Sequence, residues 1–212
     1  MKKRLKSIIL CHIFLPFQAL AQMHTDDMNY WIEKYQSVSY PLKSIHISSS
    51  YGKRADPFTG KGRFHQGIDL EAKYEVVFAM FDAEIKRVGY DPMSGNSITL
   101  KAGNYTISYC HLSEIWVKED ELVYAGQELG RSGSTGRATG PHLHISCRLH
   151  GKIENPYHLL TFVRDTQLKA VDALGLNKDV KLSPEDFLRT YAPQAMHQQR
   201  KYGIPASVIL SQ

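Results

Sequence analysis

The 212-residue sequence has few cysteines, no apolar run of membrane-spanning length and no His-Glu-x-x-His motif. A structural zinc site closes with four protein ligands that are commonly cysteines, so three cysteines disfavour such a site. The mostly apolar stretch Ile8–Leu20 is broken by His12 and Pro16 and is too short to be a permanent membrane span. Without the His-Glu-x-x-His motif, no carboxylate general base can be assigned from a motif.

The first 21 residues differ in composition from the rest of the chain. Four basic residues without an acid precede the apolar stretch, which leads into the small-residue sequence Ala19-Leu20-Ala21. This order predicts a cleaved secretory signal over residues 1–21 and a leader over 22–44, and hence export to the periplasm or the cell exterior. The remaining chain holds 22 basic and 21 acidic residues, and this near-neutral balance gives no support for nucleic-acid binding.

Two cysteines, Cys110 and Cys147, remain after the predicted signal. Each lies in a predicted strand that also holds a histidine, and alternation places Cys110 away from His111 and Cys147 away from His144. An even pair in an oxidising compartment is compatible with a disulfide. Two buried free thiols are equally compatible with the sequence.

From Ile45 onwards, short runs rich in valine, isoleucine, tyrosine and threonine alternate with turn residues. These runs predict strands at Val76–Phe81, Glu84–Tyr90, Ser97–Lys101, Tyr105–His111, Leu122–Leu129 and His142–Leu149. Turns are predicted at 91–96 and at 102–104, the second as a tight hairpin. We therefore expect a mostly β, antiparallel domain over residues 45–160 that forms a sheet or a partly open barrel.

Helical patterns flank this predicted β domain. A short helical patch surrounds Tyr30–Tyr35, and apolar residues recur at helical spacing over Thr161–Leu174. Farther on, Ser183-Pro184-Glu185-Asp186 is a strong helix start signal, with a hydroxyl cap, a proline in the first turn and early acids. Residues 161–212 are thus predicted to be a helical appendage or the start of a second domain.

The run His142–Leu149 follows the pattern of a half-buried strand. Alternation places the even-numbered side chains, including His142 and His144, on one face and the odd-numbered apolar side chains on the other. Two imidazoles about 6.5 to 7 Å apart along a strand can serve one metal, either both as ligands or one as a ligand and one beside a bound water. Two surface histidines would give the same pattern.

A second cluster, His65-Gln66-Gly67-Ile68-Asp69, supplies an imidazole and a carboxylate four residues apart. Both groups are good Zn²⁺ ligands, and three protein ligands with one open position are typical of a catalytic zinc site. His65 and Asp69, with one histidine of His142–Leu149, would complete such a set. We expect Gly67 to let the chain bend so that both side chains reach one point. A His-x-x-x-Asp spacing alone is more often structural.

A glycine-rich run over residues 130–140 leads directly into the His142–Leu149 strand. It lacks the Gly-Lys-Ser/Thr ending of a phosphate-binding loop and precedes a strand instead of a helix. The favoured interpretation is an open loop whose backbone amides pair with an extended peptide.

Three motifs, taken in order, closely resemble those of the lysostaphin-type (LytM-type) zinc endopeptidases that cleave peptidoglycan peptides. They are His65-x-x-x-Asp69, Tyr109-Cys110-His111-Leu112 and the run Ser134–His144. The lead-in Ser50–Gly60 is also similar, and the resemblance covers residues 45–157. After the last histidine the family usually has Phe-Glu, where this chain has Ile145-Ser146. This departure removes no ligand but changes the surroundings of the site.

The resemblance implies that His65, Asp69 and His144 are zinc ligands and that His111 and His142 lie beside the attacking water. Zinc acidifies a bound water and polarises a carbonyl oxygen, while histidines can move protons or hydrogen-bond the tetrahedral intermediate. It also implies Zn²⁺ as the cofactor and peptidoglycan peptides as the substrate of a secreted metallopeptidase.

Other interpretations stay open. A non-catalytic wall-binding or hydrolase-activating module can use the same fold, although an inactive version would be expected to lack one or more of the five residues. The tail over residues 183–212 weakly resembles the opening of a glucosaminidase domain but holds no catalytic acid of such a domain. The cleaved bond could lie in a D-alanyl cross-link or in a glycine bridge.

Overall fold

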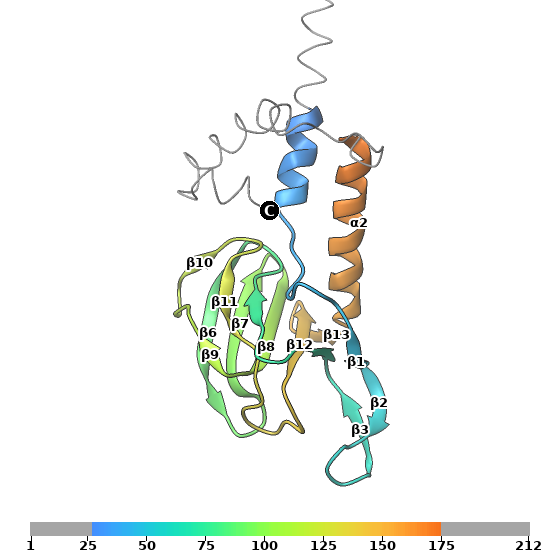
Figure 1. Ribbon diagram of the computed structural model, residues 1–212, viewed down its shortest axis with the longest axis vertical. Helices are drawn as coiled ribbons and strands as arrows, with labels where there is room; N and C mark the ends of the chain where they lie inside the picture. The colour runs from blue at the N-terminus through green and yellow to red at the C-terminus, as the bar shows by residue number, and fades with distance from the viewer. Residues whose placement is uncertain (1–26, 175–212) are drawn as a thin grey trace, which may run out of the picture. The chain divides into compact units, whose positions relative to one another are not determined.

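The computed structural model of the chain describes residues 27–174 (Figure 1). Residues 34–169 form one compact unit, and the described segments on either side of it belong to a second unit. Residues 27–36 are helical, which confirms the patch predicted around Tyr30–Tyr35. The predicted signal over 1–21 and the predicted helix start at Ser183 lie outside the described residues. No helix between residues 27 and 174 is long and apolar enough to cross a membrane.

Strands and one helix, α2, make up most of residues 34–169. The strands are β1 (Ile47–Ser49), β2 (Gly52–Ala55), β3 (Gly62–His65), β4 (Ile68–Glu71), β5 (Val76–Phe78), β6 (Ala83–Asp91), β7 (Gly95–Ala102), β8 (Tyr105–Leu112), β9 (Glu114–Ile115), β10 (Leu122–Val123), β11 (Glu128–Arg131), β12 (His142–Leu149) and β13 (Lys152–Glu154). Helix α2 spans Tyr157–Ala173 and begins earlier than the predicted start at Thr161. It follows Pro156 directly, and Asn155 Oδ1 accepts a hydrogen bond from the Tyr157 amide (3.0 Å).

The largest sheet has the strand order β1-β4-β12-β8-β7-β6-β10, with β13 paired to β12. All of its ladders are antiparallel. The end strands β1 and β10 do not pair with each other, so this sheet is open. Two smaller sheets, β5-β11-β9 and β2-β3, complete the fold. The predicted fold class, mostly antiparallel β with a helix after it, is confirmed, and the large sheet is not closed into a barrel.

Strands β6, β7 and β8 form a meander with the two turns that the sequence predicts. At the first turn, Asp91 Oδ1 accepts hydrogen bonds from the amides of Met93 (2.8 Å) and Ser94 (2.9 Å). At the second, Gly103 and Asn104 alone connect β7 to β8, and Gly103 adopts a φ of 54°. A positive φ at this position is typical of a two-residue hairpin loop.

The predicted strand Leu122–Leu129 is wrong as a single element. Its first part, β10, pairs with β6 in the large sheet, whereas β11 pairs with β5 and β9. Between the two strands Gly126 has a φ of 81°, and the Gln127 amide donates to the Tyr124 carbonyl (2.9 Å). This turn moves the chain from one sheet to another, and the apolar composition on both sides of it conceals the break.

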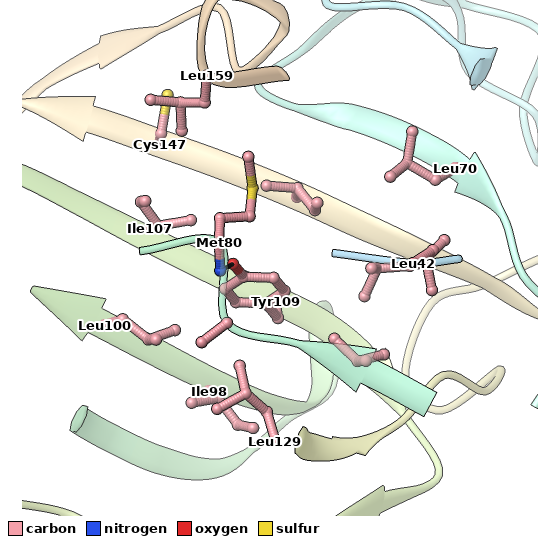
Figure 2. Packing of buried hydrophobic residues seen from close by; sticks show 14 of the residues in the cluster. Leu42, Leu70, Met80, Ile98, Leu100, Ile107, Tyr109, Leu129, Cys147 and Leu159 are labelled. Atoms are coloured by element: carbon pink, nitrogen blue, oxygen red, sulfur yellow. Dashed lines mark hydrogen bonds between the residues drawn. The ribbon is translucent and has the colours of Figure 1, made fainter. Parts of the chain in front are cut away.

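One face of the large sheet carries the hydrophobic core (Figure 2). Leu143 and Ile145 of β12 and Tyr109 of β8 are at most 1% exposed, and all three occupy odd-numbered positions. The Tyr109 hydroxyl accepts a hydrogen bond from the Met80 amide (3.2 Å), which satisfies the polar atom that this ring brings into the core. The opposite face is left to polar side chains, and it carries the histidines of β12.

Candidate metal centre

Strands β3, β4 and β12 bring His65, Asp69 and His144 together. Asp69 lies directly opposite His144 in the β4–β12 ladder, so their side chains share a face. His65 is the last residue of β3 and reaches the same place across the short connection to β4. Its Nδ1 donates a hydrogen bond to the Ser50 carbonyl (2.8 Å), which leaves Nε2 as the lone-pair atom of the ring.

The donor atoms of these three residues converge on one point. His144 Nδ1 lies 2.7 Å from Asp69 Oδ1 and 3.1 Å from His65 Nε2. His65 Nε2 lies 3.2 Å from Asp69 Oδ1. Donors about 2.0–2.2 Å from a tetrahedral zinc are separated by about 3.3–3.6 Å, so a small expansion of this triangle fits one divalent metal. The bond from His65 to a carbonyl is also typical of metal-binding imidazoles.

Gly67 provides space for His144 and not the bend that we expected from the sequence. A Cβ at this position would lie 2.4 Å from the Ile145 carbonyl oxygen and 2.5 Å from Cε1 of His144. Gly67 does not adopt a positive φ, so its backbone conformation does not require glycine. A larger residue here would therefore displace β12 or the His144 ring from the donor cluster.

His111 reaches the same region through a β-bulge at the end of β8. Two residues of β8, Cys110 and His111, stand opposite the single residue Ser97 of β7. His111 itself has a φ of 64°, in the left-handed region that few non-glycine residues adopt. Its Nδ1 donates to the Thr135 carbonyl (2.8 Å), so its Nε2 carries the lone pair.

His142 lies two residues before His144 on the same face of β12. Its Nδ1 donates to the Gly140 carbonyl (2.8 Å), and its Nε2 lies 3.7 Å from Asp69 Oδ1. The ring centroids of His111 and His142 are 4.8 Å apart. The structure thus brings all five predicted site residues together, in two groups: three residues whose ligand atoms converge on one point, and two further imidazoles with an available Nε2.

Burial and the contacts between Asp69 and its histidine neighbours together set the protonation of this cluster. Burial alone would raise the pKa of Asp69, but the imidazoles of His144 and His65 beside it hold that pKa far below its usual range. Burial lowers the pKa of His111 to about 4 and also lowers the pKa of His144. Near neutral pH the carboxylate is ionised and these two rings are neutral, and neutral imidazole can bind a metal or accept a proton.

Cys110 lies on the face of the site, contrary to the prediction from alternation. The β8–β12 register places it directly opposite His144, because the extra residue of the bulge interrupts the alternation before His111. Burial raises the pKa of its thiol to about 12, so the group stays protonated. Cys147 packs in the core, as predicted (Figure 2). Both are buried free thiols, so the structure bears out that alternative and not the disulfide.

The glycine-rich run 130–140 is braced by side chains, whereas the sequence analysis predicted an open loop. Arg137 donates two hydrogen bonds to Asp56, at 3.0 and 2.9 Å, and Arg63 donates a third at 3.0 Å. The Thr135 hydroxyl also donates to a carbonyl of β8 (2.9 Å). These bonds tie the run to the β2–β3 hairpin and to β8, and they hold the carbonyls that orient His111 and His142.

Arg54 is a site residue that no motif in the sequence predicts by itself. Its guanidinium lies 3.4 Å from Asp69 Oδ2, the carboxylate oxygen that is not part of the donor triangle. Arg54 stands inside the Ser50–Gly60 segment quoted for the family resemblance, which was the available signal. The carbonyls of Thr135 and Gly140 orient His111 and His142. They could not be predicted from the sequence, because every residue carries a backbone carbonyl.

The fold and the site together are typical of one class of protein. In this class an open antiparallel sheet holds, on its polar face, a His-Asp-His set of possible metal ligands beside two further histidines. Residues 63–156 match Peptidase family M23. This part of the chain is a domain of that family, and the resemblance to lysostaphin-type (LytM-type) peptidases is confirmed.

Relatives of known structure or name share this part of the chain. The peptidoglycan DD-endopeptidase ShyC of Vibrio cholerae is 35% identical over 119 residues, which are 55% of this chain and 28% of ShyC. The catalytic domain of the antimicrobial peptidase lysostaphin from Staphylococcus simulans is 30% identical, with a TM-score of 0.51 over 55% of this chain and 92% of that domain. A zinc-containing peptidase from Vibrio cholerae is 32% identical, with a TM-score of 0.52 over 57% of this chain and 39% of that peptidase. The chain thus spans about a third or less of the length of the curated relatives that it matches.

Proposed function

We propose that this chain is a zinc-dependent endopeptidase that hydrolyses peptide bonds in peptidoglycan stem peptides or cross-links. The observation that carries the proposal is the convergence of His65, Asp69 and His144 within 2.7–3.2 Å, beside two imidazoles with an available Nε2. The names of relatives support the substrate and the metal, since one is a peptidoglycan DD-endopeptidase and another a zinc-containing peptidase.

In this proposal His65, Asp69 and His144 hold the zinc ion. When bound, zinc acidifies a water molecule and polarises the scissile carbonyl. The bond from His65 to the Ser50 carbonyl and the contact of Arg54 with Asp69 fix two of the three donors before the metal arrives.

In this proposal His111 and His142 act as the general base and general acid of the reaction. Each has its Nδ1 proton committed to a backbone carbonyl, at 2.8 Å in both cases, so each Nε2 can accept a proton or a hydrogen bond from the attacking water. A ring that has taken this proton can stabilise the oxyanion of the tetrahedral intermediate and then return the proton to the leaving amine. This role replaces the carboxylate base that the sequence lacks.

Peptidoglycan lies outside the cytoplasmic membrane, so the proposed substrate requires export. The predicted signal over residues 1–21 would supply it, with cleavage after Ala21. The N-terminal sequence of the exported protein tests this directly, and a chain that still begins at Met1 would contradict it.

Digestion of purified cell walls tests the proposed activity. Zinc-loaded full chain is incubated with walls that carry D-alanyl cross-links and with walls that carry glycine bridges, and the products are identified by mass. The proposal predicts release of soluble muropeptides with new amine termini from at least one wall type. A non-catalytic binding module would instead sediment with the walls and release nothing, which would contradict the proposal.

A further inference from the structure

A pocket of about 440 Å³ adjoins the candidate metal centre, and we call it the side pocket. Asp69 and His142 belong to its lining, so it opens onto the site itself. Two basic side chains, Arg54 and Lys73, and the acid Glu71 also line it. The cavity beside the site thus carries two cationic side chains.

Arg54 has binding capacity that the protein does not use. It contacts Asp69 through Nη2 at 3.4 Å, and its side chain is 34% exposed. The next acid along the hairpin, Asp56, is already bound by Arg137 and Arg63. Within residues 27–174, Asp69 is thus the one ion-pair partner of Arg54. The planar fork of the guanidinium, which suits two-pronged binding of a carboxylate, remains open to the pocket.

The side pocket becomes more positive once the metal site is filled. The charge of Asp69 is then shared with a divalent cation, and Arg54 and Lys73 face only Glu71. Glu71 is exposed and lies opposite His142 in the β4–β12 ladder. Lys73 forms no ion pair with any residue between 27 and 174. The balance of charge therefore favours an anionic group of the substrate.

We propose that the side pocket is an anion subsite in which Arg54 binds a substrate carboxylate on the carbon attached to the scissile nitrogen. This inference rests on the proposed function and names its substrate class. Such a carboxylate is one residue away from the scissile carbonyl, within about 3.8 Å from one Cα to the next. Arg54 is likewise separated from the donor triangle by the single carboxylate of Asp69.

Two kinds of peptidoglycan bond carry this group, and a third does not. A D-alanyl cross-link to the carboxylate-bearing centre of a diamino acid has it, and so does a terminal D-alanyl-D-alanine. A glycine bridge lacks it. Arg54 therefore selects D-alanyl bonds of the first two kinds, because a site built to pair a charged group rejects a substrate that leaves the site unpaired.

Three synthetic peptides test the subsite. They share a D-alanyl scissile bond and carry a carboxylate, a carboxamide or a hydrogen on the carbon next to the scissile nitrogen. For the zinc-loaded full chain we expect kcat/KM to fall about 10- to 100-fold from the carboxylate to the carboxamide, the range for one charged hydrogen-bonded pair. The peptide with hydrogen, which mimics a glycine bridge, should be at least as poor.

Variants of Arg54 make the test specific. Arg54→Gln should bring the ratio of kcat/KM between the carboxylate and carboxamide peptides to about one, whatever it does to both values together, while Arg54→Lys restores part of the preference. Zinc content is measured on each variant, because Arg54 also contacts Asp69. Lys53→Gln is the control, since Lys53 is the preceding residue of β2, does not line the side pocket and should keep the full preference.

The source of the carboxylate is decided by a second pair of substrates, a cross-linked dimer and a peptide ending in D-alanyl-D-alanine. Cleavage of the dimer assigns the subsite to a cross-link carboxylate, and cleavage of the second peptide assigns it to a terminal one. Equal kcat/KM for the carboxylate and carboxamide peptides in the wild type would overturn the subsite.

Failure of the proposed function would look different, because no peptide would be cleaved at all. Calorimetric binding of the same peptides to the zinc-loaded chain then decides the subsite. A 10- to 100-fold weaker affinity for the carboxamide would support it, and equal affinities would overturn it.

Discussion

The four histidines around Asp69 differ in which ring nitrogen is available and in what that nitrogen reaches. In His65, His111 and His142 the Nδ1 donates to a carbonyl, whereas in His144 it faces the carboxylate of Asp69 at 2.7 Å. The Nε2 of His65 lies 3.1 Å from His144 Nδ1, among the converging ligand atoms, but the Nε2 of His142 lies 3.7 Å from Asp69 Oδ1. The proposed division between ligands and proton carriers therefore rests on which available nitrogen reaches the converging atoms.

This difference predicts separate effects of histidine substitutions. His144→Ala should lose zinc and activity together, because one of three donors is gone. His142→Ala or His111→Ala should keep about one zinc per chain and lose about 100-fold or more in kcat/KM, the range for general acid–base catalysis. Metal analysis by mass spectrometry beside muropeptide release measures both, and zinc loss in His142→Ala equal to that in His144→Ala would contradict the assignment.

Asp56 stabilises the surroundings of the site through its charge. Hydrogen bonds from Arg137, then from Arg63, and from the amides of its own turn hold the pKa of Asp56 well below its usual range. A carboxyl group with a lower pKa in the folded state stabilises the fold above its unfolded pKa of about 3.9. This contribution is lost as the pH falls further through the folded pKa.

Asp56→Asn should therefore reduce the dependence of the free energy of unfolding on pH below about pH 4. The wild type loses stability as the pH falls below about 4, and the variant, already less stable at pH 7, loses less over the same interval. Urea midpoints between pH 3 and pH 7 measure this. Asp165→Asn, in an exposed ion pair with Arg164, is the control and should change stability by less than about 1 kcal/mol. Parallel curves for the wild type and Asp56→Asn would contradict the role of Asp56.

At the scale of elements, the bulge in β8 decides which side chains meet the site. It adds one residue opposite Ser97, turns His111 toward the donor cluster and leaves Cys110 opposite His144. The cost is a left-handed backbone at His111, with a φ of 64°. Asparagine adopts this conformation several times more readily than a β-branched residue does.

The bulge predicts an order of stability for substitutions at His111. His111→Val should be less stable than His111→Asn by about 1–2 kcal/mol, because only the valine is β-branched in a left-handed backbone. Urea unfolding of the metal-free proteins measures the difference without a contribution from zinc. Equal stability of the two variants would show that the left-handed conformation relaxes at no cost.

Local pattern predicted β5, β6, β7, β8 and β12 and both turns of the β6–β8 meander, since alternation and turn residues are properties of neighbouring positions. Local pattern gave wrong predictions where pairing between strands far apart in the sequence determines the structure. Leu122–Leu129 reads as one strand, yet its halves pair in different sheets on either side of Gly126. The position of Cys110 depended on a bulge that no alternation rule contains.

The five site residues could be predicted because their motifs are specific when taken together and in order. The side chains that support them could not. Arg54 and Asp56 act through contacts with residues far along the chain, Asp69 and Arg137, and such contacts exist only once the sheet register is set. Gly67 was noticed, but its reason is the approach of the His144 ring, which is a tertiary contact.

Within the compact unit of residues 34–169, the candidate metal centre brings together residues that are far apart in the sequence. His65 and Asp69 lie on β3 and β4, and His144 lies on β12, between β4 and β8 in the large sheet. The unfolded chain does not hold these three donors together, so a metal that binds them favours the folded state. Stability should therefore depend on zinc.

A chelator should lower the melting temperature of the zinc-loaded chain. With free zinc at about 1,000 times its dissociation constant, binding adds about 4 kcal/mol to the free energy of unfolding, and removal of zinc takes this away. Calorimetry with and without the chelator measures the shift, and His144→Ala is the control that should show almost none. An unchanged melting temperature of the wild type would argue against zinc at this centre.

The central claim is that one zinc ion at His65, Asp69 and His144 makes this chain a peptidoglycan endopeptidase. Its most direct test is a titration of the metal-free chain with Zn²⁺, in which muropeptide release from purified walls is recorded at each addition. Activity should rise in proportion to bound zinc and stop rising at one zinc per chain. Release that does not depend on zinc, or no release at one bound zinc per chain, would contradict it.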